Sequence, residues 1–135
     1  MIEASVLNDG EAEGPVLRLD QPLSFWGAFD PATGVIIDVH HPQCGICLAG
    51  TILLMREARG SGSAPGAIAE AIRLNTAPAA IVLVAPDVNL AVGAAVAAEL
   101  YGKSCPVLAV SEAEFIILAR ASRLVIGKGG SIAAS

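Results

Sequence analysis

The sequence has few aromatic residues and few positive charges. It contains three Phe, one Trp and one Tyr, and eight Lys and Arg stand against thirteen Asp and Glu, for a formal net charge of -5. The basic residues are scattered from Arg18 to Lys128 without a cluster. A nucleic-acid-binding surface needs clustered positive charge, often with aromatic rings that stack on bases. The composition therefore argues against nucleic acid as a partner.

Long apolar runs and an export signal are also missing. No run approaches the ~18 residues that cross a bilayer, and no basic region followed by a hydrophobic stretch opens the chain. The three cysteines, Cys44, Cys47 and Cys105, cannot all pair in disulfides, and a domain of this size does not need disulfides to fold. We therefore expect a soluble, unexported, cytoplasmic protein without a membrane partner.

Apolar side chains, in contrast, are abundant. The 135 residues are 54% hydrophobic, which is enough for one domain with a buried core. We expect a single domain over residues 1–135, ending in a frayed tail at about 128–135. Such a composition leaves a small monomer little polar surface. A partner chain is therefore expected to cover part of it.

The order of apolar and polar segments predicts an α/β fold with a β-rich first half and a βαβαβ second half. Strands that are apolar along their whole length and alternate with helices indicate a sheet covered on both faces and partly parallel. Strands are expected at 4–7, 15–19, 35–39, 51–55, 79–84, 106–110 and 123–127, and helices at 67–74, up to 101, and 112–120.

Two helix starts carry capping signals. Asp87 or Asn89 is expected to cap the helix that stops at Gly102. Ser111 and Glu114 have the spacing of a capping box at the start of the next helix.

The loop at residues 56–66 is the most informative stretch, because it joins an apolar strand to an alanine-rich helix. Backbone N–H groups and the positive end of the helix dipole favour an anion or a developing oxyanion at such a junction. Ser61 and Ser63 place hydroxyls there. A purely structural interpretation is also open: Ser63 is the N-cap, Pro65 occupies the first turn, and the glycines only turn the chain. The glycine spacing is too loose for a dinucleotide site.

The loop at residues 40–47 holds both histidines and a Cys-x-x-Cys. Adjacent histidines point opposite ways in extended chain, so His40 and His41 are not expected to share a metal. An iron–sulfur cluster would need Cys105 to meet this loop. Redox chemistry is disfavoured because Cys-x-x-Cys leads into a strand rather than a helix. The aromatic segment 25–29 is expected to pack in the core or an interface rather than stack on a ligand.

Several phrases resemble the small subunit of the aconitase-X family. The likeness runs from about Pro15 to Gly127. The phrases are 25–34 (Phe-Trp-Gly-Ala-Phe-Asp-Pro-Ala-Thr-Gly), 40–43 (His-His-Pro-Gln), 48–50, 59–61 (Arg-Gly-Ser), 76–82, 97–102 and 106–107. The resemblance implies a swivelling β/β/α domain, as in aconitases, that closes over an active site carried mainly by a large subunit. It implies a hydro-lyase whose iron or iron–sulfur cluster is bound by that large subunit, with none on this chain.

The resemblance also implies site residues. Aconitase-type swivel domains carry a Gly-x-Gly-Ser-Ser-Arg motif whose first serine is the catalytic base. Gly60 and Ser61 match its Gly-Ser, so Ser61 is expected to be the base, with Arg59, Gly60, Gly62 and Ser63 binding substrate. Gly62 and Ser63 replace the second Ser and the Arg of the motif. The motif's carboxylate-binding arginine therefore has no match here.

Known members of the family dehydrate cis-3-hydroxy-L-proline or phosphomevalonate. The Ala-rich, Lys-poor composition resembles a bacterial protein and favours the hydroxyproline substrate, although a phosphate would also suit the Gly/Ser loop. A swivelling phosphohistidine carrier would use His40 or His41, but its Gly-Met-Thr-Ser-His-Ala signature is absent. A non-catalytic assembly subunit is a third alternative.

Overall fold

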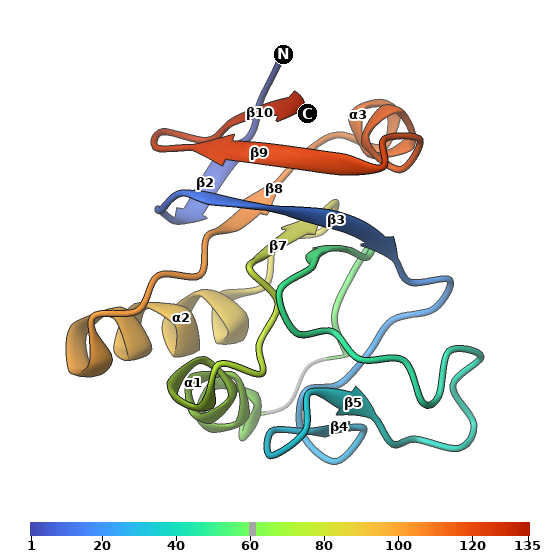
Figure 1. The fold of residues 1–135 in the computed structure, drawn as a ribbon, viewed down its shortest axis with the longest axis vertical. Coiled ribbons are helices and arrows are strands. Elements are labelled where there is room, and N and C mark those ends of the chain that lie inside the picture. Colours follow the sequence, from blue (N-terminus) through green and yellow to red (C-terminus); the bar gives the residue numbers. More distant parts are fainter. Residues whose placement is uncertain (60–61) are drawn as a thin grey trace.

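Figure 1 shows the fold of the computed structural model, which describes residues 1–59 and 62–135. The predicted α/β class is confirmed in this part of the chain. The elements are β1 (Ile2–Glu3), β2 (Ser5–Asn8), β3 (Ala12–Arg18), β4 (Phe29–Asp30), β5 (Val35–Ile36), β6 (Ile52–Leu54), α1 (Ala64–Leu74), β7 (Ala80–Leu83), α2 (Val88–Tyr101), β8 (Val107–Ala109), α3 (Glu112–Leu118), β9 (Arg123–Gly127) and β10 (Ser131–Ala134).

The main sheet is mixed, as the sequence predicted. Its strand order is β1-β10-β9-β3-β6-β7-β8-β2, and β4 pairs with β5 separately. Strands β3, β6, β7 and β8 run parallel, whereas β1, β10, β9 and β2 pair antiparallel with their neighbours. Only Ala4 separates β1 from β2, yet these strands pair at opposite ends of the order. One N-terminal segment therefore joins the two edges of the sheet.

The central strands are buried on both faces, which explains their uninterrupted apolar sequence. Side chains alternate across a strand, so Ile52 and Leu54 of β6 join one core cluster, while Leu53 and Met55 join the other. The cluster that contains Ile52 and Leu54, the inner cluster, lies among the strands and α3. The cluster that contains Leu53 and Met55, the outer cluster, lies between the sheet and the helices α1 and α2. All four side chains are fully buried.

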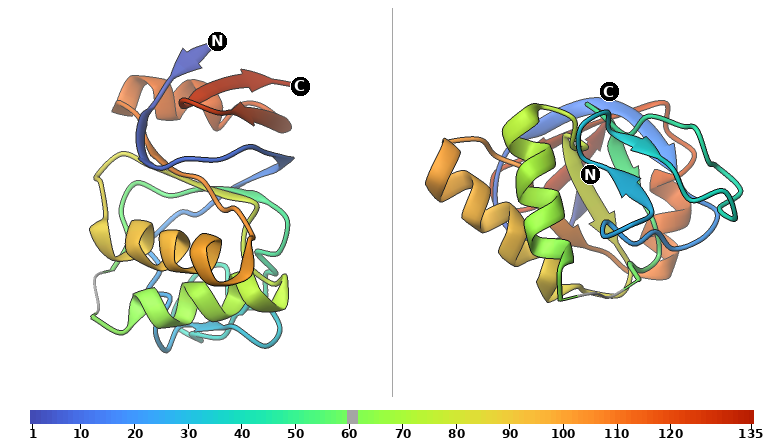
Figure 2. Two further views of the ribbon diagram at one scale, coloured as in Figure 1. Left: turned by 90° about the vertical axis from the view of Figure 1, so that its left-hand side faces the viewer. Right: turned by 90° about the horizontal axis from the view of Figure 1, so that it is seen from below.

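Helices α1 and α2 pack side by side on the outer face of the sheet (Figure 2). Their close approach depends on Gly93, because a Cβ there would lie 2.6 Å from the carbonyl oxygen of Pro65 and 2.2 Å from a methyl carbon of Ile68. The shorter helix α3 contributes Phe115 and Leu118 to the inner cluster, which also contains Ile52 and Leu54. No helix in the described ranges is long and apolar enough to cross a membrane.

The starts of α2 and α3 are capped as predicted. The Asp87 carboxylate accepts the Leu90 N–H at 3.0 Å, which identifies Asp87 rather than Asn89 as the cap. Ser111 and Glu114 form both bonds of a capping box. Gly102 ends α2 in the left-handed conformation, at φ 63°.

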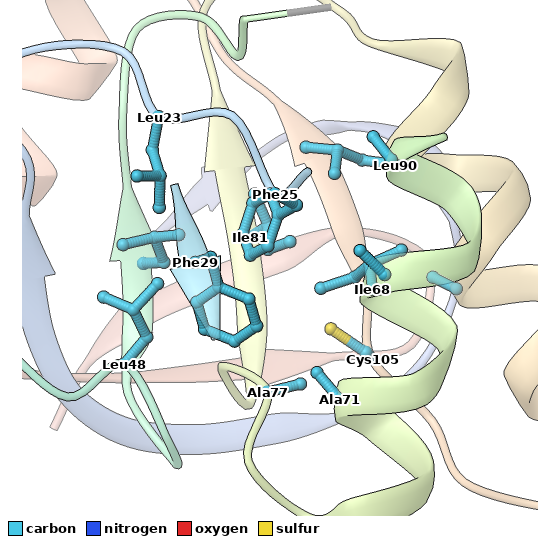
Figure 3. Packing of buried hydrophobic residues seen from close by; sticks show 14 of the residues in the cluster. Leu23, Phe25, Phe29, Leu48, Ile68, Ala71, Ala77, Ile81, Leu90 and Cys105 are labelled. Carbon is cyan, nitrogen blue, oxygen red and sulfur yellow. The ribbon is translucent and has the colours of Figure 1, made fainter. Parts of the chain in front are cut away.

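The segment between β3 and β6 folds over the outer cluster (Figure 3). Its side chains Leu23, Phe25, Phe29 and Leu48 are all buried and reach toward β6, β7 and α1. The rings of Phe25 and Phe29 meet edge to face, with centroids 5.1 Å apart. Core packing is therefore confirmed for these two rings, while Trp26 remains 61% exposed.

Two expectations were wrong. Residues 128–135 are not a frayed tail, because β10 pairs with both β9 and β1. Gly129 and Gly130, at φ 85° and 91°, make the tight turn that returns the chain from β9. The strand expected at 35–39 is shorter, since β5 ends at Ile36 and its partner β4 has only two residues.

Candidate functional site

The loop with the two serines lies where the sequence placed it, between β6 and α1. Its first part is held against the segment that follows β3. Ala58 bridges Leu23 in parallel fashion, and the Arg59 N–H donates to the Leu23 carbonyl at 3.2 Å. The predicted base Ser61 and its neighbour Gly60 lie outside the described residues.

The start of α1 matches the sequence only in part. Ser63 is the N-cap residue and Pro65 lies in the first turn, as predicted. However, Ser63 makes no side-chain capping hydrogen bond. Its backbone is helical, at φ -92° and ψ -8°, whereas a capping side chain normally extends from an extended residue. The prediction that its hydroxyl caps the helix was therefore wrong.

Gly62 also borders this start. A Cβ built on it would meet no atom of the described residues within 4 Å.

Arg59 lines a pocket of about 220 Å³. The other lining residues come from two separate segments, and they are Gln21, Pro22, Leu23, Ser24, Ala28, Asp38, His40 and His41. Arg59 is an exposed residue and takes part in none of the ion pairs of the described chain. Arg59, one of the predicted substrate-binding residues, thus lines a polar cavity. It belongs to the loop at residues 56–66, called the serine loop below.

The walls of this pocket are fixed by side-chain hydrogen bonds. His41 is 7% exposed. Its Nδ1 accepts the Gln43 N–H at 3.0 Å, which leaves the proton on Nε2 to donate to the Gln21 carbonyl at 3.1 Å. The Gln43 side chain accepts the Asp20 N–H at 2.8 Å and donates to the Arg18 carbonyl at 2.9 Å. The loop after β5 is thereby held against the end of β3.

These contacts give His41 a structural role. Both of its ring nitrogens are engaged and the ring is buried, so it does not present a nitrogen to a phosphoryl group. The neighbouring His40 is exposed and lines the pocket.

Sequence reasoning missed Ser24 and Asp38 as lining residues. The Ser24 hydroxyl closes a local turn, donating to the Trp26 carbonyl at 2.9 Å and accepting its N–H at 3.2 Å. Asp38 lies at the end of the segment expected to be a strand, and no motif marked it. The His-His-Pro-Gln phrase could have signalled the pocket, since two of its side chains hold the wall in place.

The cysteines are not gathered into one site. Cys105 is buried, its thiol donates to the Pro78 carbonyl at 3.4 Å, and burial raises the pKa of the Cys105 thiol to about 12. Cys44 and Cys47 are exposed free thiols. Within residues 1–59 and 62–135, no group of three or more His, Cys, Asp or Glu side chains is placed to hold a metal ion.

A second, apolar pocket of about 440 Å³ lies beside the start of α1. It is lined by Phe25, Trp26, Gly27, Phe29, Pro31, Gly66, Ala67 and Glu70. Its rim includes the exposed ring of Trp26. Arg59, before residues 60–61, thus lines a polar pocket, and Gly66, in the first turn of α1, lines an apolar one.

Known proteins resemble this chain in sequence and fold. A cis-3-hydroxy-L-proline dehydratase from Pseudomonas aeruginosa is 42% identical over 112 residues, which cover 83% of this chain and 19% of that protein. The chain therefore spans about one fifth of that relative's length. A phosphomevalonate dehydratase small subunit from Methanothermobacter thermautotrophicus is 38% identical over 96 residues, covering 71% of this chain and 73% of that subunit.

The fold also has a counterpart among solved structures. The crystal structure of aconitase X from Thermococcus kodakaraensis, in its holo form, superposes with a TM-score of 0.79 and 24% identity, covering 96% of this chain and 93% of that one. The profile of the aconitase X swivel domain matches residues 1–133. The chain belongs to the aconitase X swivel domain family.

Proposed function

We propose that this chain is the small subunit of an aconitase X-type hydro-lyase that dehydrates cis-3-hydroxy-L-proline together with a large subunit, and that Ser61 is the catalytic base. The observation that carries the proposal is the junction of β6, the serine loop and α1 beside the Arg59 pocket. The names of the relatives support the reaction type, since both are dehydratases.

The proposed reaction is an elimination. Ser61 takes the proton from the carbon that bears the carboxylate, and a carbon–carbon double bond forms as the adjacent carbon–oxygen bond breaks. The released hydroxyl takes a proton from solvent and leaves as water. A serine hydroxyl is a weak base unless its alkoxide is stabilised, and backbone N–H groups at a loop and helix start supply such stabilisation. Arg59, Gly60, Gly62 and Ser63 are proposed to bind the substrate around this base.

The iron or iron–sulfur cluster of the proposed enzyme belongs to the large subunit. The described part of this chain does not fit such a group, because Cys105 is a buried protonated thiol and only two other thiols, Cys44 and Cys47, are exposed. No step of the reaction on this chain is assigned to the metal centre.

A large-subunit partner is supported by the surface of α2. Exposed apolar side chains recur at every fourth residue along this helix, at Val88, Val92, Val96 and Leu100. Such a stripe is unusual on an isolated soluble helix. The cytoplasm remains our proposed location.

Phosphomevalonate is the second candidate substrate, because a small subunit named for that reaction is 38% identical. Hydroxyproline is favoured by the composition of the chain and by the greater identity, 42%, to the dehydratase named for it.

The test is a dehydration assay on the purified chain, with and without a co-expressed aconitase X large subunit. We expect no turnover by the isolated chain and turnover of cis-3-hydroxy-L-proline by the complex, with phosphomevalonate as the comparison substrate. Turnover by the isolated chain, or an inactive complex with both substrates, would contradict the proposal.

A further inference from the structure

Residues of opposite charge line the pocket beside the serine loop. They are Asp38 and Arg59, and His40 lines it with them. Neither Asp38 nor Arg59 belongs to an ion pair among the described residues. Two opposite charges that share a cavity without neutralising each other can both be used by a ligand. The complementary ligand carries one positive and one negative group.

The carboxylate of Asp38 has room for such a ligand. Asp38 is half-buried as a residue, and the hydrogen bond described for its carboxylate comes from the His40 N–H to Oδ1 at 2.9 Å. A carboxylate offers about four acceptor positions. A ligand ammonium can therefore bind without displacing the bond that orients the side chain.

The position of Asp38 is fixed before any ligand arrives. His41 and Gln43 join its loop to the end of β3 through the side-chain bonds described above. In another segment that lines the pocket, the backbone of Arg59 is held by Leu23. A receptor that is ordered in advance loses less entropy on binding and discriminates better between ligands.

Size and charge narrow the class of ligand. At about 220 Å³ the pocket lies below the ~300–1,000 Å³ of sites for drug-sized molecules, so its occupant is small. A ligand with both a carboxylate and a phosphate would place excess negative charge near Asp38, which the single guanidinium of Arg59 does not offset. A small amino acid carries one positive and one negative group, which match the charges of Asp38 and Arg59.

We propose that this pocket is a subsite for a zwitterionic amino acid, in which Asp38 binds the ammonium group and Arg59 binds the carboxylate. The inference rests on the proposed function for the presence of a substrate at the serine loop. It adds a specificity residue, Asp38, that separates an amino-acid substrate from a phosphorylated one. Binding of the carboxylate by Arg59 would place the adjacent carbon in the neighbourhood of the serine loop.

The test measures binding without turnover. L-Proline carries both charges but has no hydroxyl to eliminate, and cyclopentanecarboxylate has the same ring size without the amine. Isothermal titration of both ligands into the complex with the large subunit gives the ratio of their Kd values. We expect wild type to bind L-proline at least about tenfold tighter, the scale of one charged hydrogen bond.

Variants show which residues cause the preference for L-proline over cyclopentanecarboxylate. Asp38→Asn should remove the preference for L-proline, Asp38→Glu should retain part of it, and Arg59→Gln should weaken both ligands by a similar factor. Glu57→Gln is the matched control, because Glu57 is exposed and does not line the pocket. Melting curves of each variant complex separate lost binding from lost folding, and Asp38→Glu keeps the test decisive if Asp38→Asn does not fold.

The inference is overturned if wild type binds both ligands equally, or if folded Asp38→Asn keeps the preference. These outcomes are distinct from a failure of the proposed function. An Asp38-dependent preference in a complex that does not dehydrate hydroxyproline supports the subsite and refutes the activity. Dehydration that is indifferent to Asp38 supports the activity and refutes the subsite.

Discussion

Helices α1 and α2 lie side by side but begin in different ways. Asp87 starts α2 from an extended backbone, φ -129° and ψ 112°, and its carboxylate accepts the Leu90 N–H. Ser63 starts α1 from a helical backbone and does not cap it with its side chain. The first turn of α2 is thus capped by the Asp87 side chain, and its role is structural. The start of α1 follows the serine loop, where the proposed chemistry is located.

The contrast extends to the polar groups around each region. On the scaffold side, the Cys105 thiol and the caps of α2 and α3 find partners inside the chain. On the side of the serine loop, Asp38 and Arg59 line a pocket without an ion pair among the described residues. Changes to the first set should therefore alter stability, and changes to the second should alter binding or turnover.

The largest expected loss of stability is at the contact between the two helices. Gly93→Ala would place a methyl group against the Pro65 carbonyl and Ile68, and such overpacking costs about 1–3 kcal/mol. Urea unfolding measures the free-energy change. Gly66→Ala, in α1 with no atom of the described residues within 4 Å of the added carbon, is the matched control and should be neutral or stabilising by up to about 1 kcal/mol. Equal stability of the two variants would refute the tight contact.

A second effect depends on pH. Burial raises the pKa of Cys105 from 9.0 to about 12, so between these values the unfolded thiol ionises while the folded one stays protonated. The folded state then binds more protons, and stability falls as pH rises, by up to about 1.4 kcal/mol per pH unit. Well below pH 9 the thiol is protonated in both states, and this contribution is constant.

Unfolding free energies from pH 8 to 11 test this point. Cys105→Ala should remove that part of the slope, whereas Cys44→Ala, at an exposed thiol, should leave it unchanged. Identical slopes for wild type and Cys105→Ala would show that burial does not control this thiol.

The cap of α2 should contribute a smaller amount. Asp87→Ala removes the bond to the Leu90 N–H and should lower the free energy of unfolding by about 1 kcal/mol. Asn89→Ala is the control, since Asn89 was the alternative cap and lies inside the helix. If Asn89→Ala is the more damaging change, the assignment of the cap is wrong.

The smallest effect is expected at Ser63. If Ser63 were a side-chain N-cap, Ser63→Ala would cost about 1 kcal/mol, the usual cost of a lost cap. Because its side chain does not cap α1, we now expect a smaller loss than for Asp87→Ala, measured by the same urea titration. A loss equal to that of Asp87→Ala would remove the difference between the two helix starts.

The sequence predicted the local elements well, because their signals are local. Continuous apolar runs identified β6, β7 and β8, and Ser111 with Glu114 marked the start of α3. The role of β10 was missed: Gly129 and Gly130 turn the chain back onto β9, and the second partner of β10 contains Ile2 at the other end of the chain. Residues 128–135 are polar and glycine-rich at their start, which suggested fraying instead.

The candidate site was predicted from the sequence only in part. The strand–loop–helix order identified the serine loop and the resemblance added Arg59, but neither identified the pocket that Arg59 lines. That pocket exists because His41 and Gln43 bind backbone groups about twenty residues earlier in the chain. Hydrogen bonds over such separations leave no periodic pattern in the sequence. Asp38 was therefore identified as a candidate ligand-binding residue only from the structure, which places the loop after β5 at the pocket.

The most direct test of the account is the turnover of the Ser61→Ala complex. We expect normal folding and subunit association, with kcat lowered by roughly 100-fold or more, the scale of a positioned acid–base group. Ser63→Ala, two residues away, should have a milder effect on kcat. Near-normal turnover by Ser61→Ala, or abolished turnover by Ser63→Ala at unchanged stability, would contradict the assignment of Ser61 as the base.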